Sequence, residues 1–208
     1  MITYEGRLDA DLDYALREGS MHFEEKNAVH DTLRRITRRL AELQIPYAVV
    51  GGMAMFAHGF RRFTEYVDLL VTRESMQLIS QQLEGLGYVH PPGSRNKLRD
   101  TATGVRIEFL ITGGFPGDGK PKPVAFPDPA AVAVDIDGIH YVGLETLVEL
   151  KLASGTAPHR LKDLADVQEL VRTLSLPRTF AERIAPYVRE KFYELWDALA
   201  AGPSDDQG

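Results

Sequence analysis

The fold is decided by the stretch Val49-Val50-Gly51-Gly52-Met53-Ala54, which is followed in the chain by Arg62-Phe63-Thr64-Glu65-Tyr66-Val67-Asp68. An apolar run that ends in two glycines and continues with helix-forming residues is typical of a strand that leads into a helix. Glycines leave the backbone open to close approach, and the first backbone N–H groups of a helix are unpaired. We therefore predict a strand, a helix and a phosphate-binding turn at Gly51-Gly52.

A second strand is predicted over residues 66–71, where the side chains alternate between two faces. One face carries Val67, Leu69 and Val71 and is entirely apolar, so we expect it to contact the core. Asp68 then lies on the opposite face, next to the glycine turn. Arg62 and Thr64 precede this strand, and both side chains are suited to contact phosphate oxygens.

A third strand is predicted over residues 105–111, with Glu108 at the centre of its less apolar face. If the second and third strands are neighbours, Asp68 and Glu108 offer two hard oxygen ligands to one divalent cation, as Mg²⁺ prefers. Each carboxylate also has an alternative role without a metal. Asp68 would cap a neighbouring element, and Glu108 would form a structural ion pair with Arg106.

The remaining residues predict helices around this core. We expect an N-terminal helical segment over 1–44, an α/β core over 45–142, a C-terminal helical region over 143–201 and a disordered tail over 202–208. The further predicted elements are helices over 23–43, 74–86, 144–153, 161–174 and 180–199, the last with a break near Pro186. We also predict a loop over 112–130, and a strand or hairpin over 131–142 that turns at Asp137-Gly138.

The composition excludes several classes of protein. The 208 residues carry 24 Lys and Arg against 30 Asp and Glu, and a net charge of −6 argues against a general nucleic-acid coat, although the arginines at 34, 35, 38 and 39 form a local basic cluster. With no cysteine, disulfides, cysteine-ligated zinc and thiol nucleophiles are excluded. No apolar run approaches the roughly 20 residues of a membrane span, and the first residues do not resemble a signal peptide. We therefore expect a cytoplasmic protein without a membrane partner.

The motifs of the core resemble the nucleotidyltransferase superfamily that includes DNA polymerase β, and in particular its small bacterial branch of abortive-infection toxin-type nucleotidyltransferases. In that family, Gly-Gly is followed by Arg-x-Thr/Ser-x-Asp-x-Asp and by a third carboxylate on a later strand. This chain has Gly51-Gly52 and Arg62-Phe63-Thr64-Glu65-Tyr66-Val67-Asp68, with Glu108 as the candidate third carboxylate. The resemblance implies an α+β fold, in which a small mixed β-sheet is flanked by an N-terminal helix and a C-terminal helical region.

A second motif lies in the C-terminal region. Lys151, followed by Arg160-Leu161-Lys162-Asp163-Leu164-Ala165-Asp166, resembles the Lys…Arg-x-x-Asp-x-x-Asp helix of the toxin-type branch. Lys151 sits in an otherwise apolar helix, where a buried ammonium requires an anionic partner. The structural alternative is that Lys151, Arg160, Asp163 and Asp166 are ordinary helix charges.

The resemblance implies Mg²⁺-dependent transfer of a nucleotidyl group from a nucleoside triphosphate to an acceptor such as RNA or a protein, with an antitoxin-like protein as partner. It assigns Asp68 and Glu108 to the metal, and it assigns these two residues and Lys151 to catalysis. Asp163 and Asp166 would support these residues from behind the site. The residues that would contact the nucleotide are Gly51, Gly52, Arg62, Thr64, Lys151 and Arg160.

One residue departs from the family pattern, because Tyr66 stands where the first metal-binding aspartate belongs. A tyrosine side chain is neutral at pH 7 and adds no negative charge to a metal site. Three readings follow: a catalytically silent binding or interaction module, an altered metal site made by Asp68 and Glu108 alone, or a chemically distinct variant.

Overall fold

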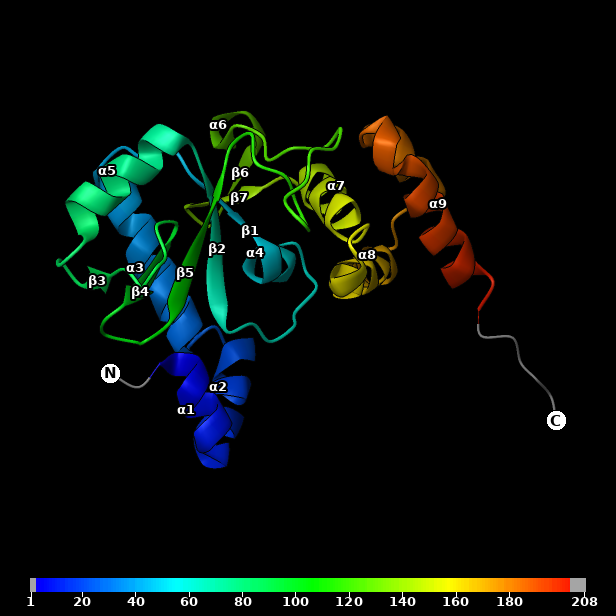
Figure 1. The fold of residues 1–208 in the computed structure, drawn as a ribbon. Helices are drawn as coiled ribbons and strands as arrows, with labels where there is room; N and C mark the ends of the chain where they lie inside the picture. The colour runs from blue at the N-terminus through cyan, green and yellow to red at the C-terminus, as the bar shows by residue number, and fades with distance from the viewer. Residues whose placement is uncertain (1–2, 203–208) are drawn as a thin grey trace. The chain divides into compact units, whose positions relative to one another are not determined.

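The computed structural model describes residues 3–202 and divides into two compact units (Figure 1). Unit 1 contains the residues up to Ala57, Arg61–Thr112 and Pro127–Val142. Unit 2 contains His58–Phe60, Gly113–Phe126 and the residues from Gly143 onward. Apart from Gly202, the predicted disordered tail lies outside the described residues. No helix within the described range is both long and apolar enough to cross a membrane.

Unit 1 is built on a seven-stranded sheet with the order β3-β4-β5-β2-β1-β7-β6. The pairs β2–β5 and β1–β7 are parallel and the other neighbours are antiparallel, so the sheet is mixed, as the family resemblance implies. The strands are β1 (Ala48–Val50), β2 (Tyr66–Val71), β3 (Tyr88–Val89), β4 (Lys97–Asp100), β5 (Arg106–Ile111), β6 (Ala133–Ile136) and β7 (Ile139–Val142).

The apolar face of β2 is the core face, as its alternation predicts. Val67, Leu69 and Val71 are completely buried. Helix α3 contacts β2 and helix α5 contacts β5, so both helices help to cover the sheet (Figure 1). The helices of unit 1 are α1 (Tyr4–Ala10), α2 (Leu12–Phe23), α3 (Ala28–Glu42), α4 (Gly51–Ala57), α5 (Arg73–Leu83) and α6 (Pro129–Val132).

Side-chain caps set several of the helix starts. Thr3, Asp11, Asn27 and Thr72 each accept a hydrogen bond from a backbone N–H of the helix that follows. The predicted helix over 23–43 was therefore placed too early, because the Asn27 cap starts α3 at Ala28. Helix α4 begins at Gly51 itself, directly after β1, rather than at Met53.

The strands β3 and β4 were not predicted. They contain two and four residues, and β4 has the sequence Lys-Leu-Arg-Asp, whose polar side chains give no strong strand signal. They occupy one edge of the sheet, where β3 pairs with β4. The predicted loop over 112–130 likewise ends in the short helix α6, which Asp128 caps. The hairpin β6–β7 turns at Asp137 and Gly138, as predicted.

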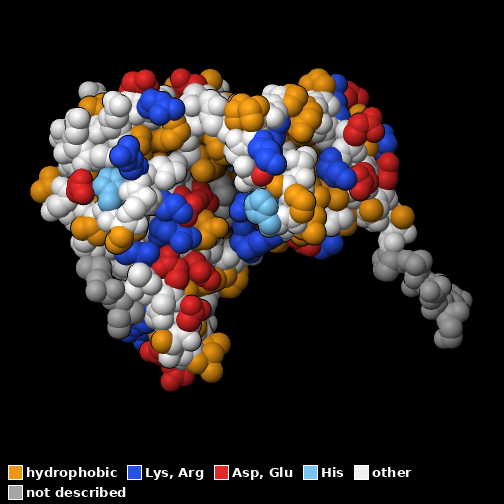
Figure 2. Space-filling view, in the orientation of Figure 1, with side chains coloured by type: hydrophobic (Ala, Val, Ile, Leu, Met, Phe, Trp, Pro, Cys, Tyr) orange, Lys and Arg blue, Asp and Glu red, His pale blue; other side chains and the backbone are white. Residues whose placement is uncertain are grey.

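Unit 2 is mainly helical. Its helices are α7 (Leu144–Ser154), α8 (Leu161–Leu174) and α9 (Pro186–Ala200), with short 3-10 helices at Pro158–Arg160 and Arg178–Arg183. Helix α8 has the predicted bounds. The predicted break near Pro186 is the start of α9, because proline is well suited to the first turn of a helix. Basic and acidic side chains are interspersed over the face shown in Figure 2, in keeping with the small net charge.

Candidate functional site

The structure brings Asp68 and Glu108 together on one face of the sheet. Strands β2 and β5 pair in parallel, and Asp68 is the register partner of Glu108. Partners in a parallel pair lie about 4.8 Å apart across the strands and project to the same side. Asp68 is also the partner of Val50, the last residue before the glycine turn. The predicted proximity of the two carboxylates and the turn is thus present in the sheet.

The two glycines make room for side chains of the candidate site. Gly51 has a φ of +64°, a left-handed conformation, and a Cβ built on it would lie 2.1 Å from Oδ2 of Asp68. A Cβ on Gly52 would lie 2.9 Å from the Cβ and Oγ1 atoms of Thr64. The sequence predicted that the glycines leave space for a phosphate. The structure adds a second reason for the glycines, which is that Asp68 and Thr64 themselves pack against the bare backbone.

Glu108 takes part in an ion pair, as the structural reading allowed. Its Oε1 atom lies 2.8 Å from Nζ of Lys97 and 3.0 Å from Nε of Arg106. Both cations approach the same oxygen, so Oε2 is the oxygen through which Glu108 is available to a ligand. Lys97 was not predicted as a neighbour, because it belongs to the unpredicted strand β4.

Tyr66 lies on the same face as Asp68, two residues earlier on β2. Its register partner is Arg106, whose guanidinium carbon lies 4.8 Å from the centre of the tyrosine ring. A cation over an aromatic face is a favourable contact. The residue at the position where the resemblance expects the first aspartate is therefore an aromatic ring that contacts an arginine.

The donor set fits one Mg²⁺ and does not fit a pair of ions. Mg²⁺ is commonly held by one or two carboxylates together with substrate phosphates, and Asp68 with Oε2 of Glu108 supplies two carboxylates. Clamps with two ions require carboxylates that bridge them, and Tyr66 has none. Within residues 3–202, no group of three or more His, Cys, Asp or Glu side chains is arranged to hold a metal.

The segment that carries Arg62 and Thr64 is anchored from α2. Nε2 of His22 lies 2.9 Å from the backbone oxygen of Arg62, and since a carbonyl only accepts, Nε2 is the donor. His22 is completely buried, and burial lowers the pKa of its ring, which keeps it neutral. Sequence reasoning missed His22, because the two residues are 40 positions apart and no spacing links them.

The predicted residues of unit 2 form one buried charge cluster. Nζ of Lys151 lies 3.0 Å from Oδ1 of Asp163 and 2.6 Å from Oδ2 of Asp166. Asp163 also accepts from Ser154 at 2.7 Å and from Nε of Arg160 at 2.7 Å. The anionic partners that a buried Lys151 requires are therefore the two aspartates of its own motif.

The cluster holds the carboxylate of Asp163 ionised. Burial opposes the ionisation of Asp163, but Lys151, Ser154 and Arg160 outweigh it and hold the pKa of that carboxyl below its usual value. Arg160 is the most exposed member, with about half of its side chain open to solvent. It is the residue of this cluster that is best placed to contact a ligand from solvent.

Comparisons with known proteins locate the fold among nucleotidyltransferases. No family model and no curated protein matches the chain in sequence. A solution structure of the antibiotic-resistance factor ANT(2″)-Ia matches with 15% identity and a TM-score of 0.51, covering 81% of this chain and 92% of that one.

Two further structures match at lower TM-scores. A crystal structure of ANT(2″)-Ia in complex with adenylyl-2″-tobramycin has 14% identity and a TM-score of 0.49, over 82% of this chain and 96% of that one. A nucleotidyltransferase-like protein from Paracoccidioides brasiliensis has 19% identity and a TM-score of 0.47, over 88% of each chain. The match to the solution structure of ANT(2″)-Ia agrees with the mixed sheet and flanking helices of this chain. We conclude that this chain has the nucleotidyltransferase fold.

Proposed function

We propose that this protein transfers a nucleotidyl group from a nucleoside triphosphate to an acceptor, using the site of unit 1. The observation that carries the proposal is the pairing of Asp68 with Glu108 in register on β2 and β5, next to the Gly51-Gly52 turn. The sequence resemblance, which rests on the same residues, and the nucleotidyltransferase fold support this proposal.

Each residue has a distinct part in the proposal. The backbone at Gly51-Gly52 and the side chains of Arg62 and Thr64 bind the triphosphate, since N–H, guanidinium and hydroxyl groups all donate to phosphate oxygens. Asp68 and Oε2 of Glu108 would hold one Mg²⁺. The ion, when bound, supplies positive charge against the phosphate oxygens.

The transfer itself requires an acceptor oxygen to attack the α-phosphorus while the bond to the β-phosphate oxygen breaks and pyrophosphate leaves. The acceptor hydroxyl must lose a proton as its oxygen attacks. A carboxylate is a suitable proton acceptor, and Asp68 is the carboxylate that lies against the glycine turn. His22 keeps Arg62 in place through its hydrogen bond to the backbone.

In unit 2, we propose that Arg160 and Lys151 contact phosphate or acceptor groups, as the resemblance implies. Asp163 and Asp166 then position both cations through the contacts already described. The finer assignment is also a proposal: a bacterial, cytoplasmic toxin-type enzyme that modifies RNA or protein and has an antitoxin-like partner. It rests on the two sequence motifs.

A specific observation favours a second candidate function. Tyr66 adds no charge at the aspartate position, and Oε1 of Glu108 is already engaged by Lys97 and Arg106. A protein with this weakened metal site would bind nucleotide without turning it over, as a silent binding or interaction module.

Titrations of ATP and of CTP, each in the presence and in the absence of Mg²⁺, separate the two functions. For an active enzyme, we expect Mg²⁺ to strengthen binding to the unmodified protein and Asp68→Asn to remove that effect. Tyr66→Asp should strengthen Mg²⁺-dependent binding by about 1.5–3 kcal/mol, the range of a charge-assisted contact, which is about 10- to 150-fold. Tyr66→Phe is the matched control, because it keeps the ring beneath Arg106.

The outcomes are distinct. Mg²⁺-dependent release of pyrophosphate by the unmodified protein would establish transfer and exclude the silent module. Mg²⁺-dependent binding that occurs only in Tyr66→Asp would support the silent module. If neither protein binds ATP or CTP, the nucleotide site in unit 1 does not exist.

A further inference from the structure

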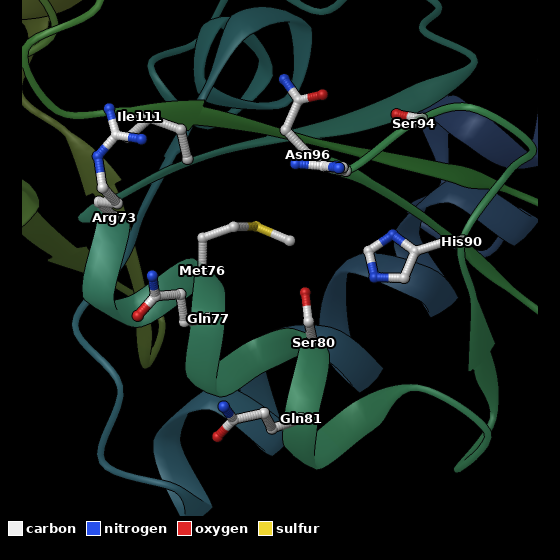
Figure 3. Close-up of a pocket in the computed structure, with 10 residues that line it drawn as sticks. Arg73, Met76, Gln77, Ser80, Gln81, His90, Ser94, Asn96 and Ile111 are labelled. Atoms are coloured by element: carbon white, nitrogen blue, oxygen red, sulfur yellow. The ribbon is translucent and has the colours of Figure 1, made fainter.

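A pocket in unit 1 has the chemistry of a binding site and has no part in the proposed transfer. It lies between α5, the segment that follows β3 and the end of β5 (Figure 3). Its volume is about 560 Å³, which lies within the roughly 300–1,000 Å³ of small-molecule sites. The pocket is therefore large enough for a ligand of nucleotide size.

The pocket is positively charged in an acidic protein. Arg73, at the start of α5, and Arg95, before β4, both line it, and no Asp or Glu is among its lining residues. Neither arginine has a salt bridge to a carboxylate anywhere in residues 3–202. The charge of Arg73 acts on the neighbouring Glu74, which does not line the pocket. Two guanidiniums without a salt bridge, in a protein with a net charge of −6, favour an anionic ligand.

The wall opposite α5 offers a fixed ring. Nδ1 of His90 lies 2.8 Å from the backbone oxygen of Lys97 and must donate to it. This hydrogen bond sets the orientation of the imidazole, and in the neutral ring Nε2 is then an acceptor. Figure 3 shows the His90 ring extending into the pocket and the Ser80 hydroxyl pointing into the same space.

The pocket also has an apolar surface between its polar walls. The side chain of Met76 lies across the middle of the pocket in Figure 3, and Ile111 adds a second apolar side chain. A flexible thioether adapts to the face of a planar ring. The amides of Gln77 and Asn96 supply both donors and acceptors at the edges. This combination suits a ring that carries polar substituents.

The pocket and the transfer site lie on opposite faces of the sheet. Ile111 pairs with Val71, which belongs to the buried core face of β2, whereas Glu108 pairs with Asp68 on the other face. Side chains an odd number of positions apart on a strand project to opposite sides. A ligand in this pocket would therefore be separate from the nucleotide that is proposed to bind at Gly51-Gly52.

We propose that this pocket binds a small phosphorylated ligand with a planar, hydrogen-bonding ring, of the class of nucleoside monophosphates. Arg73 and Arg95 contact the phosphate, Met76 and Ile111 contact the ring, and His90 with Ser80 contacts its polar substituents. The proposal does not depend on the transfer activity, because it uses none of the same residues.

The test is a titration of the full chain followed by backbone-amide NMR, with AMP, adenosine and inorganic phosphate as separate probes in buffer with EDTA. AMP should shift the amide signals of residues 73–81 and 90–96. Adenosine and phosphate should each bind at least tenfold more weakly than AMP. The double substitution Arg73→Gln and Arg95→Gln should weaken AMP binding at least tenfold, and Arg38→Gln, which removes an exposed arginine of α3 outside the pocket, should leave it unchanged.

Several results would overturn the proposal. Signal changes confined to residues 51–52 and 62–68 would assign AMP to the transfer site instead. Equal affinity for adenosine and AMP would remove the role of the arginines, and equal affinity for phosphate and AMP would remove the role of the ring. Because EDTA removes Mg²⁺ and the two sites report through different amides, failure of the pocket is distinguishable from failure of the transfer site.

Discussion

The substitution Gly51→Ala tests whether the glycine turn exists to accommodate Asp68. A non-glycine residue in the left-handed conformation costs about 1–2 kcal/mol, and Gly51 has a φ of +64°. The new Cβ would lie 2.1 Å from Oδ2 of Asp68, so the carboxylate must move by more than 1 Å to reach ordinary contact. Overpacking of this kind costs about 1–3 kcal/mol more.

A matched glycine separates these two costs. Gly138, in the β6–β7 turn, has a φ of +79°, and a Cβ there meets nothing within 4 Å. Gly138→Ala should therefore lower the free energy of unfolding by the conformational cost alone, about 1–2 kcal/mol. Gly51→Ala should lower it by about 2–5 kcal/mol. It should also weaken Mg²⁺-dependent ATP binding, because Asp68 is displaced, whereas Gly138→Ala should not.

A double-mutant cycle with urea unfolding completes the test. Asp68→Ala removes the Oδ2 and Cγ atoms that the new Cβ would meet, and leaves the Cβ of Asp68 at 3.3 Å. In that background, Gly51→Ala should cost no more than Gly138→Ala. An equal cost for Gly51→Ala with and without the Asp68 carboxylate would refute the steric argument.

Two further predictions concern stability. Lys151→Met should lower the free energy of unfolding by about 3–5 kcal/mol, because it removes the ammonium that contacts the two buried carboxylates of Asp163 and Asp166; the exposed Lys162→Met is the control, and equal melting temperatures for the two variants would contradict the prediction. Burial, assisted by electrostatic interactions with His22 and Arg34, lowers the pKa of His30 to about 3 from its ordinary 6.5. Below pH 6.5, the unfolded state therefore binds more protons than the folded state. The contribution of His30 to the free energy of unfolding is fully present above pH 6.5 and falls toward pH 3, by about 1.4 kcal/mol per pH unit. Unfolding measured at pH 7.5, 6.5 and 5.5 should show a shallower pH dependence in His30→Gln, and parallel curves would show that His30 does not titrate in this way.

Much of the central sheet could be predicted from local pattern. Alternation identified the buried face of β2 and placed Asp68 on the face opposite to it. It likewise placed Glu108 on the less apolar face of β5. The turn at Asp137-Gly138 could also be predicted from the sequence, because both residue types accept positive φ. By contrast, β3 and β4 are short and polar, so their strand conformation depends on pairing with β5 and its neighbours rather than on their own composition.

The contacts of the site could be predicted only in part. The anionic partners of Lys151 followed from the cost of burying an ammonium, and the motif supplied them within 15 residues. The hydrogen bond from His22 to Arg62 and the ion pair of Lys97 with Glu108 could not be predicted. They join segments that have no common sequence pattern, and each depends on where separate elements pack.

The amino-acid sequence by itself determined which faces of the strands are buried, where the glycine turn lies and which residues carry charge beside it. Those properties follow from side-chain periodicity and backbone freedom, which act over a few neighbouring residues. Only the tertiary structure decided that Glu108 keeps one oxygen beside two cations, that Arg106 covers the Tyr66 ring and that Asp68 packs on Gly51. Such contacts depend on strand register, and register is set by the pairing of segments that are distant in the chain.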